Sequence, residues 1–189
     1  NESVKTDIKE TLQDAKKLQK DLDELNKRIL EKKEITWQDK KKVQDLINQQ
    51  QQLEQQIENL KKENKENNSK NEEFKKSDER ILEKQKELEK MFDQILTEEM
   101  KEKLKELEKM MENLDKNKLK DMIDQMKLEN KDIEKELDRS LELFKQLEFE
   151  EKLNSTIEKL DALKEKQEKL AEKTESKQAD SEQLKKEQD

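Results

Sequence analysis

The sequence contains no cysteine, histidine, glycine, proline or tyrosine in 189 residues. Without glycine it lacks the residue that phosphate-binding loops need, because backbone must approach phosphate closely there. Without cysteine or histidine it lacks the usual ligands of zinc sites and the usual members of nucleophile–base pairs, and it forms no disulfide. We therefore expect a protein that is not an enzyme, with no catalytic residues, no metal site, no cofactor and no small-molecule substrate.

Half of the residues are charged, with 43 basic against 51 acidic side chains and a net charge of −8. An acidic chain with so few arginines is a poor ligand for a phosphate backbone, so we expect no nucleic acid partner. The apolar runs are too short for a signal peptide or a membrane span, and we expect this segment to be soluble. It starts at Asn1 without an initiator methionine and ends at Asp189 within a run of Lys, Glu and Gln. We therefore expect it to be part of a longer protein.

The residues that are abundant favour α-helix. Leu, Glu, Lys and Gln are good helix formers, and the chain lacks the two residues that most often end helices. Only 28% of the residues are hydrophobic, a level compatible with disorder. However, the charges nearly cancel and the apolar residues recur at helical spacing. We expect an all-α fold in which residues 1–189 form a single elongated helical module, an antiparallel coiled coil or helical bundle.

The first helix is predicted over residues 2–33, because apolar residues there recur at steps of three and four and form one stripe. These residues are Val4, Ile8, Leu12, Ala15, Leu18, Leu22, Leu25 and Ile29. Thr36, followed three residues later by Asp39, resembles a capping box that starts the next helix. A turn between antiparallel neighbours is therefore expected near residues 33–36.

A seven-residue repeat follows this turn. Seven of the eight positions in the series 46, 53, 60, 67, 74, 81, 88 and 95 are apolar, the exception being Asn67. Such a series keeps one seam toward a partner along a supercoiled helix. We therefore expect one very long helix over residues 37–96, roughly 90 Å in length. The polar middle of the second seam position leaves a local break near residues 67–70 as the alternative.

Three more helices are expected. Thr97 and the acidic residues after it predict a helix over 98–114. Another short helix is predicted over 118–128. Asn130 is a plausible cap for a second long helix over 131–174. Residues 175–189 should be frayed helix. In the last long helix, Ile133 to Leu147 form one stripe, whereas Phe149 to Leu163 form another roughly 160° away. We expect the buried face to change near Glu148, so that the second stripe packs on the middle of the long helix or on a surface outside this sequence.

Several large apolar residues are candidates for partner contacts: Trp37, Met110, Met111, Phe144, Phe149, Leu153 and Ile157. For each of them, a purely structural role such as core packing competes with a role in partner binding. The methionines can fill a core between short helices, or form an adaptable binding surface. Trp37 can cover the hairpin tip or anchor an interface. Residues 137–153 can form a buried central helix or a docking site. Adjacent acidic pairs such as Glu98 and Glu99 point about 100° apart and are interpreted as solvated surface.

Three segments, residues 35–60, 95–119 and 129–174, are similar to the helical part of a domain-of-unknown-function family of large membrane-anchored proteins from Bacteroidetes. The most specific pieces are the Trp-Gln-Asp-Lys-Lys-Lys start at 37–42 and the run Glu-Leu-Asp-Arg-Ser-Leu-Glu-Leu-Phe-Lys-Gln-Leu-Glu at 136–148. The resemblance implies transmembrane helices ahead of a long extracytoplasmic helical region in the cell envelope. It implies no activity and offers no catalytic residues.

These observations favour a non-enzymatic structural or scaffolding coiled-coil module of a larger cell-envelope protein, which acts as a spacer or as a partner-docking rod. The partner is expected to be another protein or a second copy, bound through coiled-coil stripes, since intramolecular and intermolecular seams have the same sequence pattern. The alternative is a chaperone-like, substrate-handling arm that takes up apolar client segments between its Met and Phe side chains.

Overall fold

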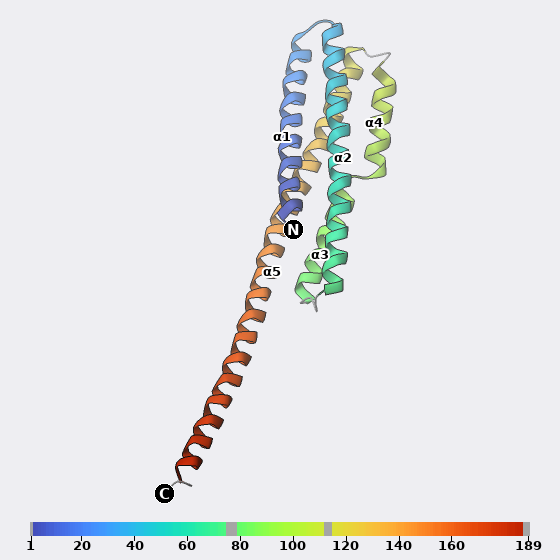
Figure 1. Ribbon diagram of the computed structural model, residues 1–189. Coiled ribbons are helices and arrows are strands. Elements are labelled where there is room, and N and C mark those ends of the chain that lie inside the picture. Colours follow the sequence, from blue (N-terminus) through green and yellow to red (C-terminus); the bar gives the residue numbers. More distant parts are fainter. Residues whose placement is uncertain (1, 75–78, 112–114, 187–189) are drawn as a thin grey trace. The chain divides into compact units, whose positions relative to one another are not determined.

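The computed structural model describes residues 2–74, 79–111 and 115–186, and every element in them is a helix (Figure 1). The helices are α1 (Glu2–Glu31), α2 (Trp37–Phe74), α3 (Glu79–Ile95), α4 (Glu98–Met110) and α5 (Lys116–Lys186). The predicted all-α fold class is confirmed. The chain divides into two units, Asn1–Leu147 and Glu148–Asp189. We call the first the bundle and the second the C-terminal segment, and describe each by itself.

Within the bundle, α1 runs antiparallel to both α2 and the first part of α5. Between α1 and α2, the side chain of Gln56 donates a hydrogen bond of 2.8 Å to Asp14. Between α1 and α5, Asn26 donates to Asp124 at 3.1 Å, and Lys127 forms an ion pair of 2.7 Å with Asp23. Residue numbers rise along one helix as they fall along its neighbour, which is the pattern of antiparallel packing.

The helices α3 and α4 cover successive lengths of α2. Lys61 of α2 pairs with Asp93 of α3 at 3.0 Å, and Glu58 of α2 pairs with Lys101 of α4 at 2.8 Å. Farther back along α2, Gln51 donates a hydrogen bond of 2.8 Å to Glu108 of α4. Both α3 and α4 therefore run antiparallel to α2. The bundle has the connectivity of an up-down-up-down four-helix bundle in which two shorter helices share the third position.

The core consists of apolar side chains that recur at helical spacing on all five helices, so that each helix buries one face. On α1 the buried apolar residues are the eight members of the predicted stripe, which confirms it. On α5 the buried apolar residues are Leu119, Met122, Ile123, Met126, Ile133, Leu137, Leu141, Phe144 and Leu147. Hydrophobic burial along these faces is the main force that holds the bundle together.

The very long helix predicted over residues 37–96 does not form. Its residues belong to two helices, because α2 ends at Phe74, α3 begins at Glu79, and the two pack against each other. A seven-residue repeat shows which residues face a core, and both arms of a helical hairpin can face the same core. The repeat therefore persists from α2 into α3, with Leu60 and Ile81 both buried. The alternative break near residues 67–70 does not occur, since α2 is helical there; residues 75–78 lie outside the described part.

The helices predicted over 118–128 and 131–174 are one continuous helix, α5, that runs to Lys186. Asn130, the expected cap, is buried inside this helix, and its side-chain nitrogen donates to the carbonyl oxygen of Ala15 at 2.9 Å and to Gln19 at 3.0 Å. The cap is instead Asp115, whose carboxylate accepts from the backbone N–H of Lys118 at 2.9 Å. The polar side chain at position 130 joins α5 to α1 and does not end a helix.

The ends of the first and fourth helices also differ from expectation. The first was predicted over 2–33, but α1 ends at Glu31, and the helix predicted over 98–114 is described as α4 only to Met110. Residues 112–114 lie outside the described part. The start of α4 agrees with the prediction, because the Thr97 hydroxyl accepts a hydrogen bond of 3.3 Å from the backbone N–H of Met100.

Candidate functional site

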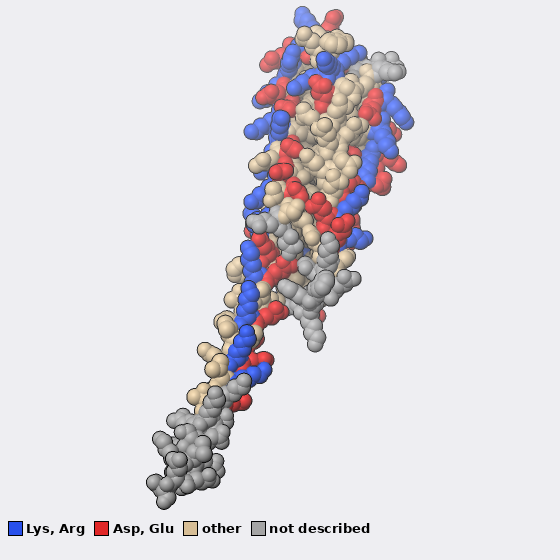
Figure 2. Space-filling view, in the orientation of Figure 1, with Lys and Arg blue, Asp and Glu red and all other residues tan. Residues whose placement is uncertain are grey.

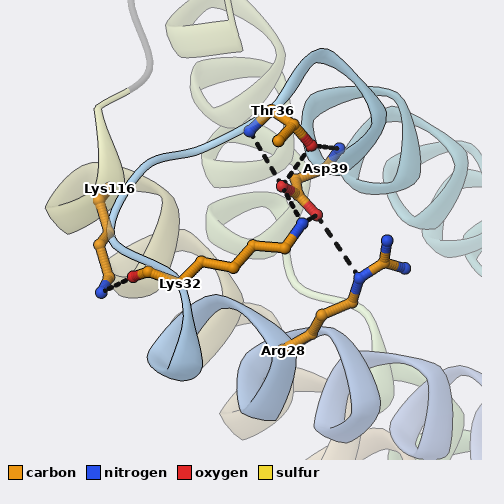
Figure 3. Close-up of polar contacts among 5 residues, drawn as sticks. All are labelled: Arg28, Lys32, Thr36, Asp39 and Lys116. Carbon is orange, nitrogen blue, oxygen red and sulfur yellow. Dashed lines mark hydrogen bonds and ion pairs between the residues drawn. The ribbon is translucent and has the colours of Figure 1, made fainter.

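A dense group of polar contacts lies where α1 meets α2 (Figure 3). The predicted capping box is confirmed: the backbone N–H of Thr36 donates to the Asp39 carboxylate at 2.9 Å, and the N–H of Asp39 donates back to the Thr36 hydroxyl at 3.3 Å. Lys32 donates to both carboxylate oxygens at 2.7 Å, and Arg28 lies 3.8 Å away. Lys116 at the start of α5 donates to the backbone carbonyl of Lys32.

The Asp39 carboxylate is 1% exposed, and its charge is compensated within the group. Burial alone would raise the pKa of Asp39, but the hydrogen bonds from Lys32 and Thr36 outweigh burial and lower it to about 2. Both oxygens of the carboxylate already accept hydrogen bonds, and the Lys32 ammonium donates to both of them. This group therefore fixes the α1–α2 turn and the start of α5, and offers no position for a ligand.

A second electrostatic group lies where α2 faces α4 and α5. Burial raises the pKa of Glu54 to about 7; Lys101 opposes this rise, whereas Glu129 and Glu58 add to it. The neighbouring Glu58 accepts a hydrogen bond of 2.8 Å from Lys101, which lowers the pKa of Glu58. Among the described residues, no group of three or more acidic side chains is placed to hold a metal ion. The group is a mixed cluster of charges between helices.

A groove of about 520 Å³ lies between α4 and α5. Leu107, Met110 and Met122 form part of its lining, and lysines such as Lys103 and Lys118 complete it together with acidic and amide side chains. Met110 is 48% exposed there, whereas Met111 is half-buried and packs on the core. Most of the described methionines therefore pack in or against the core between helices, which agrees with the core-filling interpretation, whereas Met110 lies at the surface.

The other predicted partner contacts fall in different places. Phe144 is 3% exposed and belongs to the core, so it is not available to a partner in this structure. Trp37 is 73% exposed, and its ring centroid lies 5.5 Å from the ammonium nitrogen of Lys41, so it does not cover the hairpin tip. Phe149, Leu153 and Ile157 are exposed on the C-terminal segment. The predicted residues therefore fall in both units, four in the bundle and three in the C-terminal segment.

The C-terminal segment presents an apolar stripe on a single helix. Six large side chains on one face of α5 are 47–68% exposed, and we call them the C-terminal stripe: Phe149, Leu153, Ile157, Leu160, Leu163 and Leu170. At about 100° per residue they cover an arc of roughly 140°, as wide as the face that an amphipathic helix normally buries. The division between the units falls at Leu147 and Glu148, where the sequence predicted the change of face.

Sequence reasoning selected Phe149, Leu153 and Ile157 as partner contacts but not Leu160, Leu163 or Leu170. The spacing of three and four residues that links all six was sufficient to include the others. Along this part of α5, Figure 2 shows basic side chains in a column beside uncharged ones. Lys152, Lys159 and Lys166, which are exposed and spaced by seven residues, belong to this segment. The stripe and these lysines together form the candidate site, a surface suited to another helix.

None of the helices in the described residues combines the length and the apolar character that crossing a membrane requires. No protein-family model, no curated protein and no solved structure matches the chain. The function must therefore be inferred from the geometry of the surface.

Proposed function

We propose that the chain is a non-catalytic helical module that docks another protein through the C-terminal stripe. The observation that supports this proposal is the exposure of six large apolar side chains on one face of α5. Contiguous exposed apolar surface of this kind marks interaction sites in soluble proteins. Covering the exposed half of each side chain is worth about 1 kcal/mol, so the stripe offers roughly 6 kcal/mol before the costs of association.

The bundle has a supporting role in this proposal. The first part of α5 is fixed in the bundle core by residues such as Ile133, Leu137 and Leu141. An isolated helix of ordinary length is marginally stable in water, and nucleation is its most costly step. A helix that continues from a packed first part needs no new nucleus. A partner that binds the stripe therefore pays less to order the helix than it would with a free peptide.

The resemblance noted above extends the proposal to location. We place the chain in the extracytoplasmic helical region of a larger membrane-anchored protein of the cell envelope, where it acts as a scaffold or spacer. The resemblance itself is the support for this location. The chaperone-like alternative has less support, because most of the described Met and Phe side chains that would hold client segments, such as Met122, Met126 and Phe144, are buried in the core.

A probe peptide tests docking without knowledge of the natural partner. The probe is an amphipathic helix of about four heptads with leucines on one face and glutamines beside them. We expect it to bind the full chain in fluorescence anisotropy, and the double variant Leu153→Ser/Leu160→Ser to weaken binding at least about tenfold, because two half-exposed leucines contribute about 1 kcal/mol each.

The matched control is Leu30→Ser, which replaces a leucine of the bundle that is exposed to a similar degree. This variant should bind the probe as the unmodified chain does. No binding of the probe, or equal binding by the double variant, would contradict docking through the stripe. Circular dichroism of the variants checks that their helical content is unchanged.

A further inference from the structure

We infer that the partner docked on the C-terminal stripe is an amphipathic helix whose acidic residues face Lys152, Lys159 and Lys166. This inference rests on the proposed function, because it takes docking through the stripe as given. It adds the chemical character of the partner, which follows from the charges beside the stripe.

The three lysines follow the stripe in register. Each directly precedes a residue of one seven-residue series, Leu153, Leu160 and Gln167, so that they lie along one edge of the stripe. If this series takes heptad position a, then Phe149, Leu163 and Leu170 take position d. The lysines then occupy position g, where side chains of paired helices meet and select partners by charge. All three are exposed, and Lys152 also forms an ion pair of 3.0 Å with Glu148 of the same helix.

A second copy of the same stripe does not supply the complementary charge. In a parallel pair, position g meets position e of the following heptad in the other helix, so Lys159 would meet Lys164 and Lys152 would meet Ile157. In an antiparallel pair, the row of lysines would meet itself. Neither arrangement pairs the row with acids, and like charges across an interface oppose association. A partner with glutamate or aspartate at the facing positions would form an attractive pair with each lysine.

The bundle of a second copy does not offer a suitable surface either. Among the described residues of the bundle, the large apolar side chains that are exposed are Leu30, Trp37, Met110 and Leu128. They come from four different helices, α1, α2, α4 and α5. A stripe-shaped helix face needs a continuous apolar seam opposite it, and four separate residues do not provide one.

A lipid surface is less favoured than a helix by the charge balance of the segment. Helices that lie on anionic membranes carry a marked excess of Lys and Arg on the polar face. Residues 149–170 contain six acidic and five basic side chains, which leaves no net attraction to anionic lipid. Three of the five lysines, Lys152, Lys159 and Lys166, form an ordered row, and such a row matches the regular charges of a partner helix.

The test compares two probe peptides with the same leucine face, one with glutamate and the other with lysine at the flanking positions. The full chain is titrated with each at about 50 mM and about 500 mM salt. We expect the glutamate peptide to bind at least about tenfold more tightly at low salt, and the difference to shrink at high salt because screening weakens exposed charge pairs.

The decisive variant is Lys152→Glu/Lys159→Glu/Lys166→Glu, which should reverse the preference between the peptides. The matched control, Lys9→Glu/Lys17→Glu/Lys20→Glu, changes the net charge equally with exposed lysines of α1 and should preserve the preference. If both peptides bound equally well, the charge inference would be overturned and docking through the stripe would stand. If the chain bound neither of these peptides and also failed to bind the glutamine probe, the proposed function would be overturned as well.

Two further measurements test whether a second copy of the chain or a membrane surface covers the stripe instead. Sedimentation equilibrium of the chain alone should give the mass of a monomer at micromolar concentration; a dimer abolished by Leu153→Ser/Leu160→Ser would overturn the inference in favour of a second copy. Vesicles of about three parts phosphatidylcholine to one part phosphatidylglycerol should leave the chain in solution. Binding to these vesicles with loss of peptide binding would overturn it in favour of a membrane surface.

Discussion

Replacing Asp39 by asparagine should destabilise the bundle and should also change how its stability depends on pH. The substitution keeps the shape of the side chain but removes its charge. In the native chain the two carboxylate oxygens accept hydrogen bonds from the Lys32 ammonium at 2.7 Å and from the Thr36 hydroxyl at 2.6 Å. Asparagine has one oxygen in place of two, and its NH₂ group would face the Lys32 ammonium.

The magnitude follows from the pKa of Asp39, which lies at about 2 in the folded chain, whereas the ordinary value for an aspartate is 3.8. Each pKa unit corresponds to about 1.4 kcal/mol, so the charged form is favoured by roughly 2 kcal/mol on folding. Because Lys32 and Arg28 are partly exposed, solvent screens part of this energy. We expect a loss of about 1.5 kcal/mol at pH 7, equivalent to roughly 3–6 °C in Tm.

The sign of the pH dependence is fixed by the direction of the shift. Because the folded pKa is lower than the ordinary value, the stabilisation is fully present above pH of about 4 to 5 and is lost as the pH falls toward about 2. Urea unfolding followed by circular dichroism at several pH values measures this. The difference between the native chain and Asp39→Asn should shrink toward zero on acidification.

The matched control is Asp45→Asn, at an exposed position of the same helix α2. A surface substitution of this kind should change the free energy of unfolding by less than about 0.5 kcal/mol at any pH. Two results would refute the stabilising role of the Asp39 carboxylate at the α1–α2 turn. One is that Asp39→Asn is as stable as the native chain at pH 7, and the other is that its loss of stability is the same at pH 2 and pH 7.

Two other predictions concern the interior of the bundle. Because burial raises the pKa of Glu54 to about 7, its ionisation disfavours the folded state, and the free energy of unfolding should fall as the pH rises from about 4.5 to 7. Glu54→Gln should flatten this fall and raise Tm at pH 8. An unchanged pH profile in thermal melts of the variant would contradict the raised pKa of Glu54. Phe144→Ala should lower the free energy of unfolding by about 3–5 kcal/mol in urea titrations, because it leaves a cavity in the core. Phe149→Ala, at an exposed position, should lower it by less than about 0.5 kcal/mol. Equal losses would contradict the burial of Phe144 and the exposure of Phe149.

Features that depend on one or two helical turns could be predicted from the sequence. The stripe of α1 repeats every three or four residues, and the capping box of Thr36 and Asp39 and the cap at Thr97 each join residues three positions apart. All three are present. The C-terminal stripe is likewise a local pattern, so its position on α5 was predictable. The nature of its partner could not be read from periodicity, because the same spacing serves internal and external seams.

Features that depend on how helices meet in space were predicted less well. The antiparallel packing of α3 on α2 was missed because a seven-residue repeat shows which residues face a core and not the direction of the chain. Asn130 was interpreted as a cap because asparagine is common there, but its amide bonds to α1 115 residues away in sequence. Asp115, which does cap α5, precedes a run rich in Lys and Asn, and its N-cap preference was a signal that could have identified it.

The central claim is that residues 149–170 form an exposed docking helix, and hydrogen–deuterium exchange of the full chain with and without the glutamate-flanked peptide tests it most directly. In the free chain, a helix without packing on its apolar face should exchange much faster than the bundle core. Bound peptide should slow exchange across 149–170 and leave the bundle unchanged. Protection of this segment comparable to the core in the free chain, or protection that appears only in the bundle when peptide is added, would contradict the claim.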